Sequence, residues 1–130
     1  MPQFGRRSKE QLSSCHADLQ KLFNEVIKHY DCTILEGYRS NEDQLKAFNA
    51  GKSRIKSGGK HNHLPSLAAD VAPWPIDWND KNRFYHFAGT VQGIAKMLDI
   101  KIRWGGDWDS DNDLKDQTLY DLPHFELITE

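Results

Sequence analysis

The chain has 130 residues, a formal net charge of −2 at pH 7, and 38% hydrophobic and 11% aromatic residues. This length fits one domain and is too short for two, so we expect a single domain over residues 1–130. No segment approaches the roughly 20 apolar residues that span a bilayer, which excludes stable membrane insertion. The nearly balanced charge gives no strong field for nucleic acid, and the aromatic content argues against disorder.

The two cysteines and the N-terminus point to a protein made in the cytoplasm. Cys15 and Cys32 are too few for a disulfide framework, so we expect free thiols in a reducing compartment. Residues 1–7 carry positive charge, but no apolar stretch follows them. The sequence therefore predicts no secretory signal peptide.

The first half of the chain predicts two helices separated by a strand. Apolar residues recur at helical spacing from Ser8, which with Gln11 forms a capping box, to about residue 29. Residues 32–35 form a short β-branched, apolar segment typical of a strand. A second helix is expected over 42–50, with Leu45 and Phe48 facing inward and Gly51 ending it.

The second half predicts three strands and one long helix. Residues 51–62 read as a loop rich in glycine, lysine and serine, and residues 105–118 as an acidic loop. The expected elements between and after these loops are a strand at 67–71, a helix at 80–99, and strands at 101–104 and 125–128. Because helices and strands do not alternate strictly, we predict an α+β domain with helices packed on a mostly antiparallel sheet.

Three histidines lie outside the expected helices, in segments rich in turns: His61, His63 and His124. Two imidazoles and one carboxylate, with a fourth position open to water, are a ligand set of catalytic zinc. Asp70 follows His63, and Asp121 precedes His124 across a proline-containing turn. A carboxylate beside the water but not bound to the metal would act as general base. From the residues alone, a structural histidine capped by a carboxylate is the commoner alternative.

Four segments then carry a resemblance to a known family. His63 to Asp70 matches an S-x-H-x6-D signature, and Asp121 with His124 matches its second half. Residues 37–40, followed by Gln44, match G-x-R-[ST], and residues 103–108 match R-[FW]-G-x-D-W. In this order the segments resemble the zinc D-Ala-D-Ala carboxypeptidase and L-alanyl-D-glutamate peptidase family, phage endolysin type. That resemblance implies a fold like that of the Hedgehog and DD-peptidase domains.

The resemblance also implies a role for individual residues. His63, Asp70 and His124 would bind one zinc ion, and Asp121 would be the catalytic base. Arg39 would stabilise the oxyanion or hold a substrate carboxylate, since its charge is permanent and its donors are forked.

Three further residues are candidates for substrate binding: His61, Gln44 and Glu126. His61 occupies the place of the family serine, and we expect it to face substrate or solvent. The H-x-H pair leaves open that His61 binds the metal, but only His63 has the six-residue spacing from Asp70 that the family motif specifies. Glu126 should share a strand face with His124, as a group behind the metal ligands, a substrate contact or an exposed carboxylate.

The function implied is that of a phage endolysin. It would be a monomeric zinc peptidase that hydrolyses peptidoglycan stem peptides at the L-Ala–D-Glu bond, without a separate wall-binding domain. Lacking a signal peptide, it would reach the wall from the host cytoplasm after the membrane is permeabilised. The alternatives are a D,D- or L,D-carboxypeptidase of the same family and a non-catalytic zinc-containing binding module.

Two other features of the sequence are a possible calcium loop and four tryptophans. Residues 107–116 open like a calcium loop, but Asn112 and Thr118 replace the glycine and glutamate that such a loop needs. We therefore expect a solvated acidic loop, with calcium binding as the lesser alternative. The four tryptophans are expected mostly in the core or the wall of the cleft, with one or two stacking on glycan or peptide: Trp74, Trp78, Trp104 and Trp108.

Overall fold

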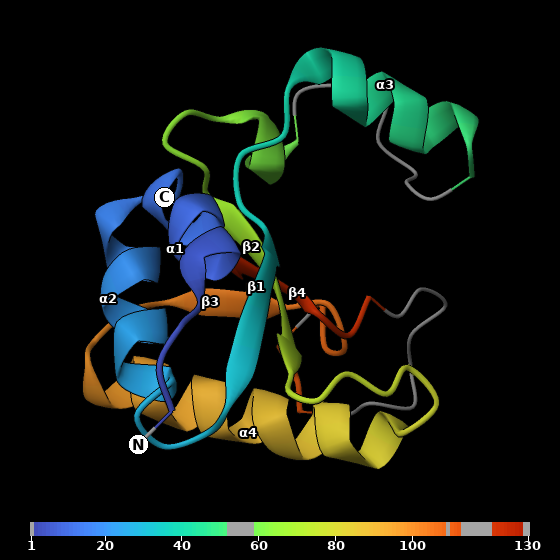
Figure 1. The fold of residues 1–130 in the computed structure, drawn as a ribbon. Helices are drawn as coiled ribbons and strands as arrows, with labels where there is room; N and C mark the ends of the chain where they lie inside the picture. Colours follow the sequence, from blue (N-terminus) through green and yellow to red (C-terminus); the bar gives the residue numbers. More distant parts are fainter. Residues whose placement is uncertain (1, 52–58, 109, 113–120, 129–130) are drawn as a thin grey trace.

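The computed structural model describes residues 2–51, 59–108, 110–112 and 121–128. These residues form four α-helices, a short 3-10 helix and four strands. The helices are α1 (Arg6–Ser13), α2 (Ala17–Val26), α3 (Asn41–Asn49), η1 (Lys60–Asn62) and α4 (Lys81–Met97). The strands are β1 (Cys32–Glu36), β2 (Ala68–Pro73), β3 (Ile102–Trp104) and β4 (His124–Leu127). They form one antiparallel sheet in the order β1-β2-β4-β3, which confirms the α+β fold (Figure 1).

The two faces of the sheet have different characters because side chains alternate along each strand. Val71 on β2 and Phe125 on β4 are fully buried in the hydrophobic core, together with residues of α2 and α4. The intervening residues Asp70, His124 and Glu126 point to the opposite face. The sheet thus has an apolar face covered by helices and a polar face where acids and histidines gather.

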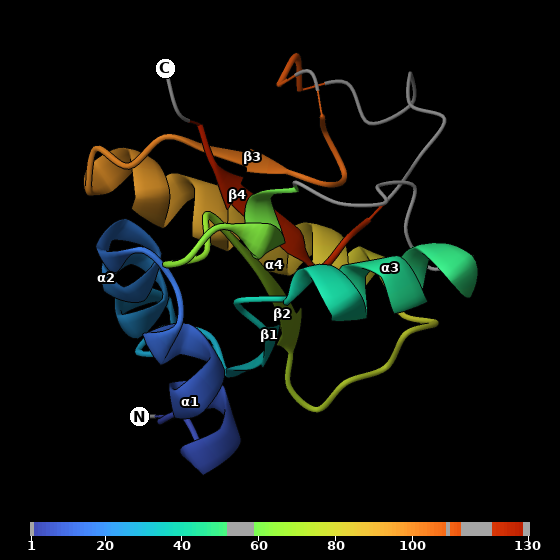
Figure 2. The same cartoon turned by 90° about the horizontal axis from the view of Figure 1, so that it is seen from above.

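The core is centred on three fully buried phenylalanines. The ring of Phe125 lies 5.7 Å from that of Phe23 on α2 and 6.0 Å from that of Phe87 on α4, both edge to face. These contacts join the two helices to the middle of the sheet. Figure 2 shows α4 running behind the strands while α3 lies on the other side.

The predicted helix from residue 8 to about 29 is wrong, because the chain breaks into α1 and α2. Ser8 does not cap a helix: its hydroxyl accepts a hydrogen bond from the backbone N–H of Ile34 and pairs with Thr33. α1 therefore covers the outer edge of β1, a way of protecting an unpaired strand edge. The chain turns at Cys15, and His16 caps α2 by accepting from the backbone N–H of Asp18.

Helix α3 stands away from the core. It begins after Ser40, whose hydroxyl accepts from the N–H of Asp43, and it ends before Gly51 at a φ of 74°. Leu45 and Phe48 are each 39% exposed, so the expectation that they face inward is wrong.

The remaining elements lie close to their predicted positions, with bounds shifted by one or two residues at most ends. Among the described residues, no helix combines the length and the apolar character needed to cross a membrane. Residues 109 and 113–118 of the acidic loop, on which the calcium alternative depended, lie outside the described residues.

Candidate active site

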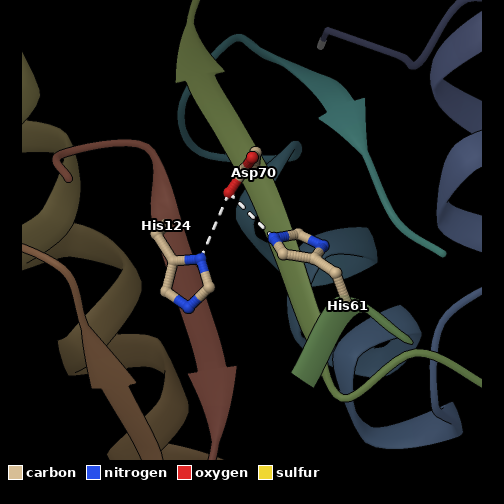
Figure 3. A group of neighbouring side chains, drawn as sticks. All are labelled: His61, Asp70 and His124. Atoms are coloured by element: carbon tan, nitrogen blue, oxygen red, sulfur yellow. Dashed lines mark hydrogen bonds and ion pairs between the residues drawn. The ribbon is translucent and has the colours of Figure 1, made fainter. Parts of the chain in front are cut away.

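Three side chains converge on the polar face of the sheet: His61 from η1, Asp70 from β2 and His124 from β4 (Figure 3). Asp70 Oδ1 lies 3.2 Å from His61 Nε2 and 3.3 Å from His124 Nδ1. One ligand atom from each residue lies within 4.8 Å of the other two. Asp70 and His124 meet because they are direct partners across β2 and β4.

His61 is held in this position by its backbone and by its other ring nitrogen. Its Nδ1–H donates to the carbonyl oxygen of Gly37 at 2.7 Å, since a carbonyl only accepts. When the imidazole is neutral, this leaves the lone pair of Nε2 facing Asp70. The carbonyl of His61 in turn accepts from the N–H of Arg39 at 2.8 Å. Position 37 requires glycine, because a Cβ there would lie 2.3 Å from the carbonyl oxygen of Gln11.

His124 is oriented in the same manner by a carboxylate. Its Nε2–H donates to Glu126 Oε1 at 2.9 Å, which turns Nδ1 toward Asp70. Glu126 Oε2 accepts from Arg103 Nη2 at 2.8 Å. The Arg103 guanidinium lies 5.7 Å from the ring centre of Trp108, whose ring lies 5.3 Å from that of His124. The four side chains form a closed ring of contacts, and a carboxylate behind a ligating histidine is typical of metal sites.

The residue set fits a zinc ion. With zinc–ligand bonds of about 2.0–2.1 Å, neighbouring atoms of a tetrahedral site lie about 3.3 Å apart. The two measured distances to Asp70 Oδ1, 3.2 and 3.3 Å, agree with that spacing. Both histidines are buried, and each directs one nitrogen into the cluster and donates from the other. The group could therefore hold a metal ion with a position left for water.

The group that the structure brings together differs by one residue from the expected ligand set. His61, which we expected to face substrate or solvent, is 6% exposed and lies in the cluster. His63 follows η1 as an exposed residue and is not part of the group. The family distance to Asp70 favoured His63, but residues 63–65 form an exposed excursion before Ser66 returns to pair with the backbone of Ser14. The metal candidate is thus the first histidine of the H-x-H pair.

The charges of the cluster stabilise one another. Burial alone would raise the pKa of Asp70, but hydrogen bonds from His124 and His61 hold it well below its usual range. Burial would lower the pKa of His124, but Asp70 and Glu126 raise it to about 9. The pKa of Glu126 is lowered, because bonds from His124 and Arg103 outweigh its burial.

Asp121 lies beside the cluster without joining it. Its Oδ2 is 3.9 Å from His124 Nδ1, and its side chain is 45% exposed. Burial and the negative charge of Asp70 raise its pKa. Two backbone bonds of 2.9 Å, from Asp121 N–H to Gly105 O and from Gly105 N–H to His124 O, fix the turn. A Cβ on Gly105 would lie 2.0 Å from the carbonyl oxygen of Asp121, so this close approach requires glycine.

Arg39 borders the cluster on the side of β1. Its Nη2 lies 3.7 Å from Asp70 Oδ2, and its Nε donates to Glu36 Oε1 at 2.7 Å. Nη1 donates to the amide oxygen of Gln44 at 2.9 Å. Gln44, a candidate for substrate binding, is 2% exposed and therefore contacts Arg39 rather than open solvent.

Sequence reasoning did not identify Glu36, Arg103 and Trp108 as supporting residues. Glu36 ends β1 three residues before Arg39, but only pairing of β1 with β2 places it opposite Asp70. Arg103 and Trp108 belong to the segment 103–108 that matches a family motif, but the motif assigned neither residue a role. Arg103 supports Glu126, its direct partner across β3 and β4.

Comparisons with known proteins identify the family of the chain. The family model described as phage L-alanyl-D-glutamate peptidase matches residues 1–128. The L-alanyl-D-glutamate peptidase of Escherichia phage T5 is 33% identical over 133 residues, covering 96% of this chain and 97% of the relative. The peptidoglycan L-alanyl-D-glutamate endopeptidase CwlK of Bacillus subtilis is 28% identical over 115 residues, covering 78% of this chain and 63% of CwlK.

Among solved structures, the fold is similar to that of the L-Ala D-Glu endopeptidase ChiX of Serratia marcescens. The TM-score is 0.76 at 28% identity, over 97% of this chain and 90% of ChiX. The family match extends over nearly the whole sequence, so it includes every residue of the cluster described above. The chain belongs to the phage L-alanyl-D-glutamate peptidase family.

Proposed function

We propose that this protein is a zinc endopeptidase that cleaves the L-Ala–D-Glu bond in the stem peptides of bacterial peptidoglycan. The zinc ligands are His61, Asp70 and His124. The observation that carries the proposal is their convergence, beside the separate carboxylate of Asp121. Family membership supports the bond that is cleaved, and the fit of the three ligand atoms supports the metal.

Zinc, when bound, acidifies a water molecule and polarises the carbonyl group of the scissile bond. Asp121 takes the proton of the attacking water on its carboxylate and later gives it to the leaving amine of D-Glu. A C–O bond forms at the L-Ala carbonyl carbon, and the C–N bond to D-Glu breaks. The raised pKa of Asp121 suits a group that must both accept and release a proton.

Arg39 supplies a permanent positive charge at the edge of the cluster. We assign it to stabilising the negative charge that develops on the carbonyl oxygen or to holding a carboxylate of the substrate. Glu36 and Gln44 restrict its guanidinium to one position, which lowers the cost of ordering it when substrate binds. His63, since it is exposed, has no part in this proposal.

The biological setting follows from the same proposal. The enzyme would act as a monomer on the cell wall after the host membrane has been permeabilised, as a phage lysis protein does. The described residues contain no helix suited to crossing a membrane, so passage would depend on another component.

Digestion of purified peptidoglycan tests this function directly. Mass spectrometry of the products should show stem peptides that begin at D-Glu, and glycan strands that keep L-Ala. EDTA should abolish the release, and added zinc should restore it. Release of D-Ala instead would identify a carboxypeptidase, and no product from the zinc-loaded protein would favour a binding module.

A further inference from the structure

Two exposed tryptophans lie on one loop that the catalytic account does not use. Trp74 is 51% exposed and Trp78 is 57% exposed, in the segment that joins β2 to α4, which we call the aromatic loop (residues 74–80). Exposed apolar side chains that gather in one patch can mark a binding surface. Neither ring contributes to the hydrophobic core cluster.

The aromatic loop is held rigidly by its own contacts. The guanidinium of Arg83 on α4 donates to the carbonyl oxygens of both Trp74 and Pro75. The Trp78 ring stacks on Phe84, with ring centres 5.4 Å apart and planes inclined by 20°. Rings that are already ordered lose little conformational entropy when a ligand covers them.

The aromatic loop also lies on the same side of the sheet as the active site. The backbone N–H of Trp74 donates to the carbonyl oxygen of Asp31 at 2.9 Å, so strand pairing of β2 with the start of β1 continues to this residue. Residues 70, 72 and 74 therefore point to one face. Trp74 follows Asp70 by four residue steps along the strand, a span of about 13 Å. Figure 1 shows the loop leaving the end of β2 that lies farther from α3.

Bound substrate would place a sugar ring near the aromatic loop; this step rests on the proposed function. In peptidoglycan the L-Ala residue is joined through a lactyl group to a sugar ring of the glycan strand. Two chain units separate the scissile carbonyl from that ring, or about 7 Å when extended. The ring or its neighbour along the strand therefore falls within reach of Trp74.

We propose that Trp74 and Trp78 form a binding site for the neutral sugar rings of the glycan strand. Sugar rings present faces of C–H groups, which pack on the faces of indole rings. The charges around the tryptophans are balanced between acids and bases: Asp77, Asp80, Lys81 and Arg83. This balance gives no attraction for an anionic wall polymer or membrane surface, so it favours the neutral glycan.

The test compares two substrates of the same enzyme. One is peptidoglycan with its glycan strands, and the other is a synthetic stem peptide that contains the L-Ala–D-Glu bond but no sugar. Trp74→Ala and Trp78→Ala should each lower kcat/KM on peptidoglycan about tenfold, the effect of losing one well-packed aromatic contact. Activity on the sugar-free peptide should stay unchanged, which also shows that the variants fold. The matched control is Met97→Ala, an apolar residue 86% exposed at the end of α4.

The proposal is overturned if the tryptophan variants match the wild type on peptidoglycan or lose activity equally on both substrates. A binding measurement separates this outcome from failure of the proposed function. Glycan strands freed of peptide should quench tryptophan fluorescence saturably in the wild type and not in the double variant. If the wild type cleaves neither substrate, the peptidase function fails, and the quenching experiment still decides whether the sugar site exists.

Discussion

Among single residues, Asp121 is the carboxylate suited to proton transfer, because its Oδ2 lies 3.9 Å from His124 Nδ1 while the side chain stays outside the cluster and partly exposed. Asp121→Asn keeps the size of the side chain and removes the basic oxygen. We expect kcat to fall by about 10²–10⁴-fold with zinc content unchanged, since Asp121 is not a ligand in this account. Steady-state kinetics and metal analysis check both parts. The control is Asp18→Asn on the exposed side of α2, and full activity in Asp121→Asn would place the base elsewhere.

Glu126 acts through His124 rather than on substrate. It is 5% exposed, accepts from His124 Nε2–H and is itself bound by Arg103. Glu126→Ala removes the group that orients the imidazole, so zinc affinity should fall about 10–100-fold. Glu126→Gln keeps an acceptor and should lose less. Competition with a chromogenic chelator measures both affinities, and an unchanged affinity in Glu126→Ala would show that His124 needs no such support.

Between β3 and β4, the backbone pairing of Gly105 with Asp121 and His124 sets the distance from the base to the metal site. Gly105→Ala would place a methyl group 2.0 Å from the carbonyl oxygen of Asp121, so that strand or that turn must move. We expect activity to fall at least tenfold, because a shift of about 1 Å in a catalytic group can cost 10²-fold. Gly89→Ala is the control, since a Cβ there meets nothing within 4 Å. Equal activity of the two variants would refute a positioning role for this turn.

Local patterns in the sequence predicted most elements but failed where tertiary contacts decide. The apolar spacing of residues 8–29 is continuous, yet the helix breaks because the backbone at Cys15 pairs with Ser66. Tertiary structure also decides which histidine lies beside Asp70. Residues 63–65 are exposed between η1 and β2, and His63, chosen for its spacing from Asp70 in the sequence, is not part of the group that contains His61. The place of Asp70 and His124 in one site, by contrast, was implied by the resemblance.

In the whole molecule, the two cysteines report on the integrity of the packing between helices and sheet. Cys15 and Cys32 are free, and are 1% and 4% exposed. Burial raises the pKa of Cys15 to about 11 and that of Cys32 to about 12. Because only an accessible thiolate reacts, neither should be alkylated by iodoacetamide at pH 8 in the native protein. Intact mass should show no adduct before denaturation in urea and two afterwards; a native adduct would contradict the packing described.

The fold class was accessible from the sequence because helices and strands occur without strict alternation, and the structure confirms a four-stranded antiparallel sheet with helices on its apolar face. The supporting ring of Arg103, Glu126, His124 and Trp108 was not, since it needs the pairing of β3 with β4. Motifs identified the segments that meet. Only the sheet shows which side chain of each segment reaches the cluster.

Metal content of two histidine variants tests the central claim most directly. Purified His61→Ala and His63→Ala would be analysed for zinc by mass spectrometry beside the wild type, with folding checked by circular dichroism. We predict about one zinc per chain in the wild type and in His63→Ala, and loss of zinc in His61→Ala, because three protein ligands hold a catalytic ion. Retention of zinc by His61→Ala together with its loss from His63→Ala would contradict the account.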